Sequence, residues 1–179
     1  MKWICYFFGC LVLAPFAAAQ NAPTVKQAES ACGPFDVKFD VKTSGAQHPL
    51  APASVGKAQV YLIEDWVPLG VSGGPGKPII RLGMDGRWMG ADQGDSYLFF
   101  TVDPGEHHLC VNWQPGFLAP PHSTTSLYAF EAKPNQTYFF RARMPDLPNG
   151  LGILLGPINI DEARLLLAQY PHAMSQKKK

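Results

Sequence analysis

Closely spaced turn signals in the middle of the chain constrain its fold more than any other feature of the sequence. Residues 84–113 read MDGRWMGADQGDSYLFFTVDPGEHHLCVNW. Asp103-Pro104-Gly105-Glu106 separates two runs suited to strands, Tyr97–Val102 and His107–Trp113. Proline presets φ at the first central turn position and glycine accepts a positive φ. This turn and the earlier Asp85-Gly86 turn are each expected to reverse the chain as a β-hairpin.

Further strands are predicted on both sides of this stretch. Residues 35–42 alternate apolar with charged side chains, which is typical of a strand with one face in water. Residues 57–64 include a run that is apolar on both faces, so this strand is expected at the centre of a sheet. Residues 78–84 lead into the first turn, and Leu127–Ala132 is expected to pair with Thr137–Met144. The pattern predicts a mainly β chain folded as an antiparallel β-sandwich.

One helix is predicted, near the C-terminus. Asn159 is suited to the N-cap, and Glu162 follows at the spacing of a capping box. Five side chains then form one apolar stripe that would pack on the sandwich: Ile160, Ala163, Leu166, Leu167 and Tyr170. Pro171 ends the helix, and residues 171–179 are expected to be a flexible basic tail. The sandwich and helix are therefore expected to form a single domain over residues 35–170.

The first residues carry the pattern of a secretory signal peptide, residues 1–19. Lys2 precedes an apolar run, and Ala17-Ala18-Ala19 supplies small residues for cleavage before Gln20. The run is shorter than the roughly 20 residues that cross a bilayer, and no membrane span is expected in the mature chain. Residues 20–34 are expected to be an N-terminal leader, and the mature protein is expected in the periplasm or outside the cell.

Export changes how the cysteines are interpreted. Cys5 and Cys10 leave with the signal peptide, whereas Cys32 and Cys110 remain as a pair in an oxidising compartment. A disulfide is therefore expected, and closing so long a loop would stabilise the fold by roughly 4–5 kcal/mol through chain entropy. The alternative is a free, catalytic Cys110 beside a neighbouring histidine, but nothing in the sequence indicates a base presented to its sulfur.

Charge and motif content argue against several classes of function. The formal net charge is +1, and the only basic run is the C-terminal one, so nothing favours nucleic acid as a partner. The glycines of residues 70–76 lack the Gly-Lys-Ser/Thr ending of a phosphate-binding loop. Asp92, Gly94 and Asp95 lack the alternating ligands and the terminal glutamate of a calcium loop. No cofactor and no metal site is expected.

The preferred hypothesis is a non-catalytic module that binds or organises an envelope protein or a glycan, or has a structural role in the envelope. Trp66, Trp88 and Trp113 are the candidate contact residues, because they lie in or beside irregular stretches. Each of them is more often a core residue than a binding platform, since tryptophan buries a large apolar area.

The alternative hypothesis is a hydrolytic or metal-binding enzyme that uses His107, His108 and His122. Adjacent residues of a strand point to opposite faces, so His107 and His108 cannot readily share one metal or one substrate. No nucleophile elbow and no zinc-protease motif accompanies them. No residue is therefore assigned a catalytic role.

The turns and their flanking strands resemble a known family of modules. Asp85-Gly86, Gly90 and Asp103-Pro104-Gly105 have the spacing of the PEGA-type β module. More closely, the strand over Lys57–Tyr61 and the strand reached through Lys133–Phe139 resemble a bacterial secreted domain of unknown function, number twenty-eight forty-six. The resemblance implies an immunoglobulin-like or transthyretin-like sandwich in the cell envelope. It implies no reaction, since the family itself has no assigned activity, and its motifs are mostly turn chemistry that marks a fold.

Overall fold

The structure, a computed structural model, describes residues 31–44, 50, 53–65, 77–114, 125–144, 146–147 and 150–179. Its elements, in chain order, are β1 (Phe39–Ser44), β2 (Ala58–Asp65), β3 (Ile79–Met84), β4 (Arg87–Gln93), β5 (Ser96–Val102), β6 (Gly105–Trp113), β7 (Thr125–Ala132), β8 (Thr137–Arg143), β9 (Asp146–Leu147), β10 (Gly150–Leu151), β11 (Leu154–Pro157), α2 (Ile160–Gln169) and β12 (His172–Lys177). The predicted signal peptide and most of the predicted leader lie outside the described residues.

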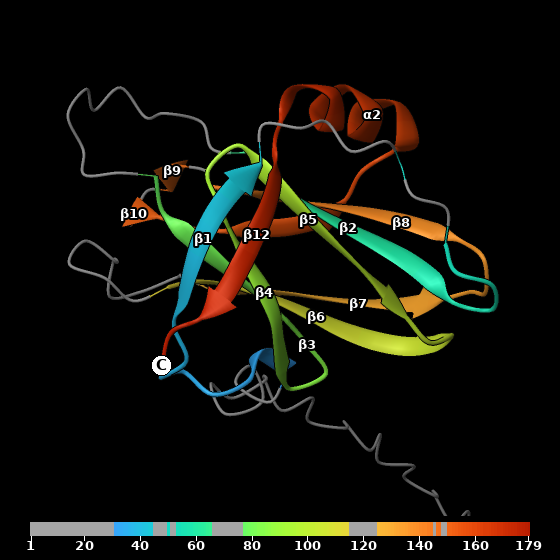
Figure 1. Ribbon diagram of the computed structural model, residues 1–179, viewed down its shortest axis with the longest axis horizontal. Helices are drawn as coiled ribbons and strands as arrows, with labels where there is room; N and C mark the ends of the chain where they lie inside the picture. Colours follow the sequence, from blue (N-terminus) through green and yellow to red (C-terminus); the bar gives the residue numbers. More distant parts are fainter. Residues whose placement is uncertain are drawn as a thin grey trace, which may run out of the picture.

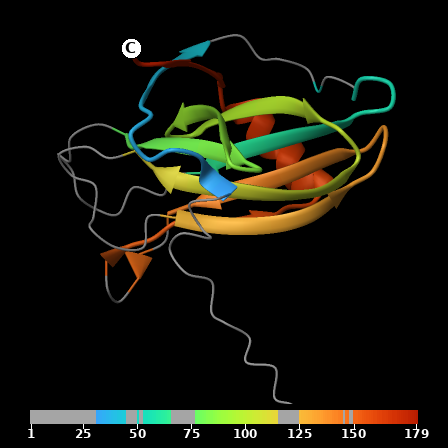
Figure 2. The same ribbon diagram turned by 90° about the horizontal axis from the view of Figure 1, so that it is seen from below.

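Two sheets pack face to face and confirm the predicted sandwich (Figure 1). One sheet has six strands in the order β1-β12-β5-β2-β8-β11, and the other has four in the order β4-β3-β6-β7. Helix α2 covers the outer face of the six-stranded sheet. Residues 31–38 cross the outer face of the four-stranded sheet, on the side nearer the viewer in Figure 2.

The core follows from the alternation of side chains along β2. Val60 and Leu62 point between the sheets, whereas Tyr61 and Ile63 point outward and pack under α2. As predicted, β2 is central, since β5 and β8 pair with its two sides. The pairs β2–β8 and β5–β12 are parallel, so the antiparallel expectation holds for the four-stranded sheet and not throughout the six-stranded one.

Two of the predicted hairpins are connections between the layers. The Asp103-Pro104-Gly105 turn leads from β5 in one sheet to β6 in the other, and the turn around Asn135 leads from β7 to β8 in the same way. Turn chemistry predicted both reversals of direction, but it does not distinguish a hairpin from an arch between sheets. The strands on either side of the first arch do not pair with each other. Strand β5 pairs with β2, and β6 pairs with β3 and β7.

The Asp85-Gly86 turn does form the predicted hairpin, between β3 and β4. Asp85 has φ 49° and Gly86 has φ 81°, the pair of positive values that suits a tight reversal between twisted strands. Strand β4 continues to Gln93, and two residues, Gly94 and Asp95, separate it from β5.

The first strand begins later than predicted, at Phe39 instead of residue 35. The carbonyl oxygens of Phe35 and Val37 accept hydrogen bonds from Arg81 Nη1 at 2.8 and 2.7 Å. Backbone groups that bond to this buried guanidinium are not available for a strand ladder, so residues 35–38 lie across β3 instead of extending β1.

The predicted flexible tail is instead the strand β12. All six of its residues pair antiparallel with β1, and His172 also pairs with Tyr97 of β5. Lys178 N donates to Lys38 O at 2.8 Å beyond the end of the strand. The sandwich domain therefore includes this C-terminal segment, because a backbone held between two strands does not fray.

Serine hydroxyls join the two sheets along both of their edges. Ser126 Oγ on β7 accepts from Leu155 N on β11, and Ser175 Oγ on β12 accepts from Ala91 N on β4, each at 3.1 Å. A Cβ on Gly90 would lie 2.9 Å from Ser175 Oγ. Glycine at position 90 thus lets β12 come close to the edge of β4.

Candidate functional site

The predicted disulfide joins Cys32 to Cys110, whose Cα atoms are 5.1 Å apart. Gly83 stands opposite Cys110 on the neighbouring strand, and a Cβ at Gly83 would collide with the Cys32 backbone. The bridge fastens residues 31–38 across the four-stranded sheet. The 78-residue separation corresponds to about 4.5 kcal/mol of chain-entropy stabilisation.

Arg81 and Trp88 lie beneath this N-terminal segment and are structural. Arg81 is fully buried, and its Cζ lies 4.4 Å from the centroid of the Trp88 ring, a cation–π distance. The Trp88 indole Nε1 donates to Pro34 O at 2.6 Å, and burial lowers the pKa of Arg81 to about 10. Sequence reasoning missed Arg81, although a lone arginine in an otherwise apolar strand is a signal for a buried cation.

The three candidate tryptophans do not form a binding platform in the described structure. Trp88 is only 6% exposed, and Trp113 packs half-buried against the core between the sheets. Trp66 lies outside the described residues. Trp88 is therefore buried away from any partner, whereas the contact roles of the half-buried Trp113 and of Trp66 stay predictions.

Asp85 uses its position in the β3–β4 turn to hold the start of β6. Its carboxylate accepts from His108 N at 2.9 Å and lies 2.7 Å from His107 Nδ1. The other ring nitrogen of His107, Nε2, lies 2.8 Å from the carbonyl oxygen of Asp103. Since a carbonyl and a carboxylate only accept, both contacts are hydrogen bonds only when both ring nitrogens carry a proton, as in an imidazolium.

Electrostatics agree with this protonation. Partial burial lowers the pKa of His107, but the hydrogen bonds to Asp85 and to Asp103 O outweigh it and raise the pKa above its ordinary value. Partial burial raises the pKa of Asp85, and the donors at His108 N and His107 outweigh that and lower it. His107 therefore stabilises the turn and has no free nitrogen to act as a base, and His122 lies outside the described residues.

His108 points to the other side of β6 and borders an open hollow of about 440 Å³. Ala31, Asp85, Leu109, Leu127, Tyr128 and Ala129 line the rest of this hollow. Leu127 is 42% exposed. Among the described residues, 31–38 cover the β3–β4 half of the sheet and reach the hollow through Ala31, and Leu127 and Ala129 on β7 are exposed.

Carboxylates lie along the same face. Glu106 on β6 stands directly opposite Glu131 on β7, and both side chains are exposed. Like charges directly opposite one another destabilise a strand pair. His108 Nε2 approaches Glu106 Oε1 at 3.7 Å. We refer to Asp85, Glu106, His108, Leu127, Ala129 and Glu131 together as the β7 surface.

Strand β7 also forms an edge of its sheet. Among the described residues it pairs only with β6, over eight residues, and β11 reaches it through the Ser126 hydrogen bond. An edge strand carries backbone donors and acceptors that can pair with another chain. The sequence suggested no role for this edge, because alternation reveals a strand but not its place in a sheet.

A second acidic feature lies between the sheets at the other end of β2. Glu64 on β2 and Asp92 on β4 are both 0% exposed. Gly94 N donates to Glu64 Oε2 at 2.9 Å, and no well-aligned donor in the described structure reaches the other three carboxyl oxygens. The alternation Val60, Leu62, Glu64 along β2 was a signal for a buried carboxyl that sequence reasoning passed over.

Burial, reinforced by the neighbouring Asp92 carboxyl, raises the pKa of Glu64 well above its ordinary value. Burial raises the pKa of Asp92 to about 7. The Glu64 and Asp92 carboxyls interact with one another, and an interaction between two carboxyls is attractive only while one of them keeps its proton. The pair is closed to solvent and presents no group to a substrate.

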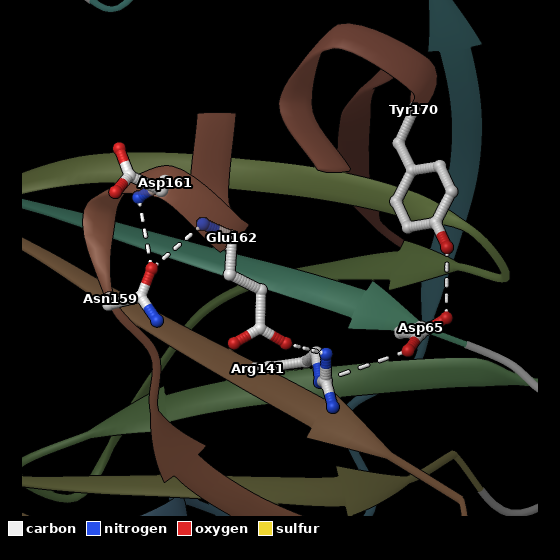
Figure 3. Close-up of polar contacts among 6 residues, drawn as sticks. All are labelled: Asp65, Arg141, Asn159, Asp161, Glu162 and Tyr170. Atoms are coloured by element: carbon white, nitrogen blue, oxygen red, sulfur yellow. Dashed lines mark hydrogen bonds and ion pairs between the residues drawn. The ribbon is translucent and has the colours of Figure 1, made fainter. Parts of the chain in front are cut away.

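A third polar cluster fixes α2 to the six-stranded sheet (Figure 3). Arg141 on β8 forms ion pairs with Glu162 of α2 and with Asp65 at the end of β2. Tyr170 donates its hydroxyl to Asp65 Oδ1 at 2.9 Å, and its burial, together with this bond, raises the pKa of Tyr170. The cluster connects the helix to two strands.

The N-cap of α2 is as predicted, but its capping box is not. Asn159 Oδ1 accepts from Asp161 N and Glu162 N at 3.0 and 2.9 Å, whereas the Glu162 carboxylate reaches Arg141. On the predicted apolar stripe, Ala163, Leu166 and Leu167 are buried, but Ile160 is exposed. The Glu162 side chain therefore forms a tertiary ion pair with Arg141 instead of the capping hydrogen bond that the local spacing predicted.

No group of three or more metal-ligating side chains occurs within the described residues. Among the helices that the structure describes, none has the length and apolarity to cross a membrane. Comparisons with family models, with curated proteins and with solved structures each found no match to this chain. The resemblance to the PEGA-type module and to the secreted domain of unknown function stays a prediction.

Proposed function

We propose that the protein is an exported, non-catalytic binding module of the cell envelope, and that its contact site is the β7 surface. The observation that carries the proposal is the coincidence of a strand edge, unpaired among the described residues, with an apolar hollow on the same strand. Adding an extended segment to a sheet edge gains affinity from backbone hydrogen bonds and specificity from pockets for alternate side chains. Export rests on the N-terminal sequence pattern.

Charge selects the partner. Asp85, Glu106 and Glu131 place three carboxylates around the apolar part of the β7 surface, and the imidazolium of His107 compensates only Asp85. An extended protein segment that alternates basic with apolar side chains would relieve the Glu106–Glu131 opposition and fill the hollow at Leu127. Electrostatic complementarity of this kind sets partner choice and association rate.

Site-resolved photo-crosslinking in the organism that makes the protein tests the proposal. A photoreactive amino acid replaces Ala129, which is exposed on β7, or Leu165, which is 58% exposed on α2 and serves as the matched control. We expect a crosslinked protein at position 129 and none at position 165. Mass spectrometry should locate the crosslink in an extended segment rich in lysine or arginine.

A charge variant sharpens the result. Glu131→Lys should reduce the crosslinking at position 129 at least several-fold, because it replaces attraction by repulsion. Asp161→Lys makes the same charge change on α2 at a side chain that is 90% exposed and should leave the crosslinking unchanged. Equal crosslinking at positions 129 and 165, or an equal response to both charge variants, would contradict the β7 surface as the contact site.

A further inference from the structure

The Glu64–Asp92 pair connects the two layers of the sandwich, because Glu64 belongs to the six-stranded sheet and Asp92 to the four-stranded sheet. The neighbours of Glu64 on the adjacent strands are Ser96 and Ala142, and the neighbour of Asp92 is Ile80. None of these is a cation. With both side chains fully buried, two negative charges in contact would be strongly disfavoured.

The charged groups around the pair do not supply a compensating partner. Asp95, in the turn between β4 and β5, adds negative potential and is paired with Lys77 at 2.8 Å. Asp65 and Arg141 bond to each other and to α2 on the outer face of the six-stranded sheet. Arg81 points to the opposite face of the four-stranded sheet, where it contacts Trp88. Within the described structure, no cationic side chain pairs with Glu64 or Asp92, so a proton on one carboxyl is what removes their repulsion.

We propose that Glu64 and Asp92 form a proton-dependent latch, which ties the β4–β5 turn to β2 while the pair is protonated and releases the turn when both carboxyls ionise. Glu64 is the residue that reaches the turn, through the hydrogen bond from Gly94 N. Gly94 and Asp95 also line an open groove of about 920 Å³, together with Lys77, Gln93 and Tyr170. Release of the turn therefore reshapes one wall of this groove, independently of the β7 surface.

The sign of the pH effect follows from the protonated native state. In the unfolded chain both carboxyls ionise near pH 4, whereas Asp92 in the folded protein has a pKa of about 7. Stability from the latch is fully present below the unfolded pKa values and is lost as the pH rises through the folded ones. Each proton that only the native state retains raises the unfolding equilibrium constant about tenfold per pH unit.

Urea unfolding of the wild type and of a variant without the pair, between about pH 5 and about pH 6, isolates the pair, because every other titrating group is common to both chains. We expect the unfolding equilibrium constant of the wild type to rise at least about tenfold across this unit relative to that of the double variant Glu64→Gln/Asp92→Asn. Asp161→Asn, at an exposed acid, is the matched control and should follow the wild type. A double variant with the wild-type slope would overturn the proposal.

Two measurements on the folded wild type remain decisive even if the double variant does not fold. The infrared carbonyl band of a protonated carboxylic acid should persist at neutral pH and disappear on alkaline titration. Hydrogen exchange at Gly94 N should accelerate over the same range relative to Gly86 N, the donor of a matched turn hydrogen bond to Ala31 O at 3.1 Å. Loss of the band in mild acid, or a constant exchange ratio, would overturn the latch.

Discussion

Two carboxyl groups near opposite ends of β4 have pKa values that move in opposite directions. Asp85 lies in a turn, next to an imidazolium and a backbone donor, and these partners outweigh its partial burial and lower its pKa. Asp92 lies inside the sandwich beside Glu64, and burial raises its pKa to about 7. Both residues are aspartates, and they lie near opposite ends of β4, so the residue type alone does not determine the pKa.

The difference shows that the balance between burial and hydrogen-bond donors determines the charge of a carboxyl in this fold. Asp85 contacts donors from the first residues of β6, whereas Asp92 contacts another carboxyl. The stability that Asp85 contributes is therefore lost as the pH falls below its unfolded pKa. The stability that Glu64–Asp92 contributes is lost as the pH rises above the unfolded pKa values of these two residues. The protein should be most stable in mildly acidic solution.

The largest effect is expected when Asp85 loses its carboxylate. Asp85→Ala removes two charge-assisted hydrogen bonds and places alanine at a positive φ, so the free energy of unfolding should fall by about 2–4 kcal/mol. Asp85→Asn keeps a residue that tolerates this φ and should lose about half as much. Equilibrium unfolding in urea at pH 6 measures both, and equal losses would show that charge contributes nothing at this turn.

Replacing the buried pair by apolar side chains should have the opposite sign. Glu64→Met combined with Asp92→Val removes both carboxyls at similar volume and should stabilise the protein by about 1–3 kcal/mol at pH 8, with a smaller gain at pH 5. The single variant Glu64→Met leaves Asp92 without its partner and serves as the control. A double variant that is less stable than the wild type at pH 8 would mean that the pair stabilises the native state in its ionised form.

Local sequence patterns predicted much of the fold, and they failed where the result depends on tertiary contacts. Alternation predicted strand β2, turn chemistry predicted the Asp85-Gly86 hairpin, and capping preference predicted the helix cap at Asn159. The Cys32–Cys110 disulfide was predicted from an even pair of cysteines and the expectation of export. The turns at Pro104 and Asn135 were predicted as hairpins, although the chain crosses between sheets there. Whether a turn connects two strands of one sheet depends on which distant strands pair with the two strands that flank it.

The candidate sites were harder to predict than the fold. The histidines and tryptophans attracted attention because of their residue type, yet His107 is engaged at both nitrogens and Trp88 is buried under residues 31–38. The β7 surface depends on β7 being an edge strand, and the Glu64–Asp92 contact depends on how two sheets stack. Neither relation is encoded in a local pattern, because the residues concerned are separated along the chain.

A smaller effect is expected from the protonation of His107. Its folded pKa is raised, so its contribution of about 1 kcal/mol is present below the unfolded pKa of about 6.5 and is lost as the pH rises through the folded value. Nuclear magnetic resonance titration of the His107 ring gives this pKa directly. Asp85→Asn should lower it, and an unchanged titration in that variant would show that Asp85 does not hold the proton.

The smallest effect concerns Glu106 and Glu131, two carboxylates that face each other across strands in water instead of in the core. Water screens their repulsion, so Glu131→Lys should stabilise the protein by only about 0.2–1 kcal/mol, and the gain should shrink in high salt. The thermal midpoint with and without salt measures both quantities. A gain as large as that of the buried double variant would mean that solvent does not separate the two carboxyl pairs. If Glu131→Lys gives a small gain in stability and a large loss of crosslinking at position 129, the two carboxylates contribute to binding and not to folding.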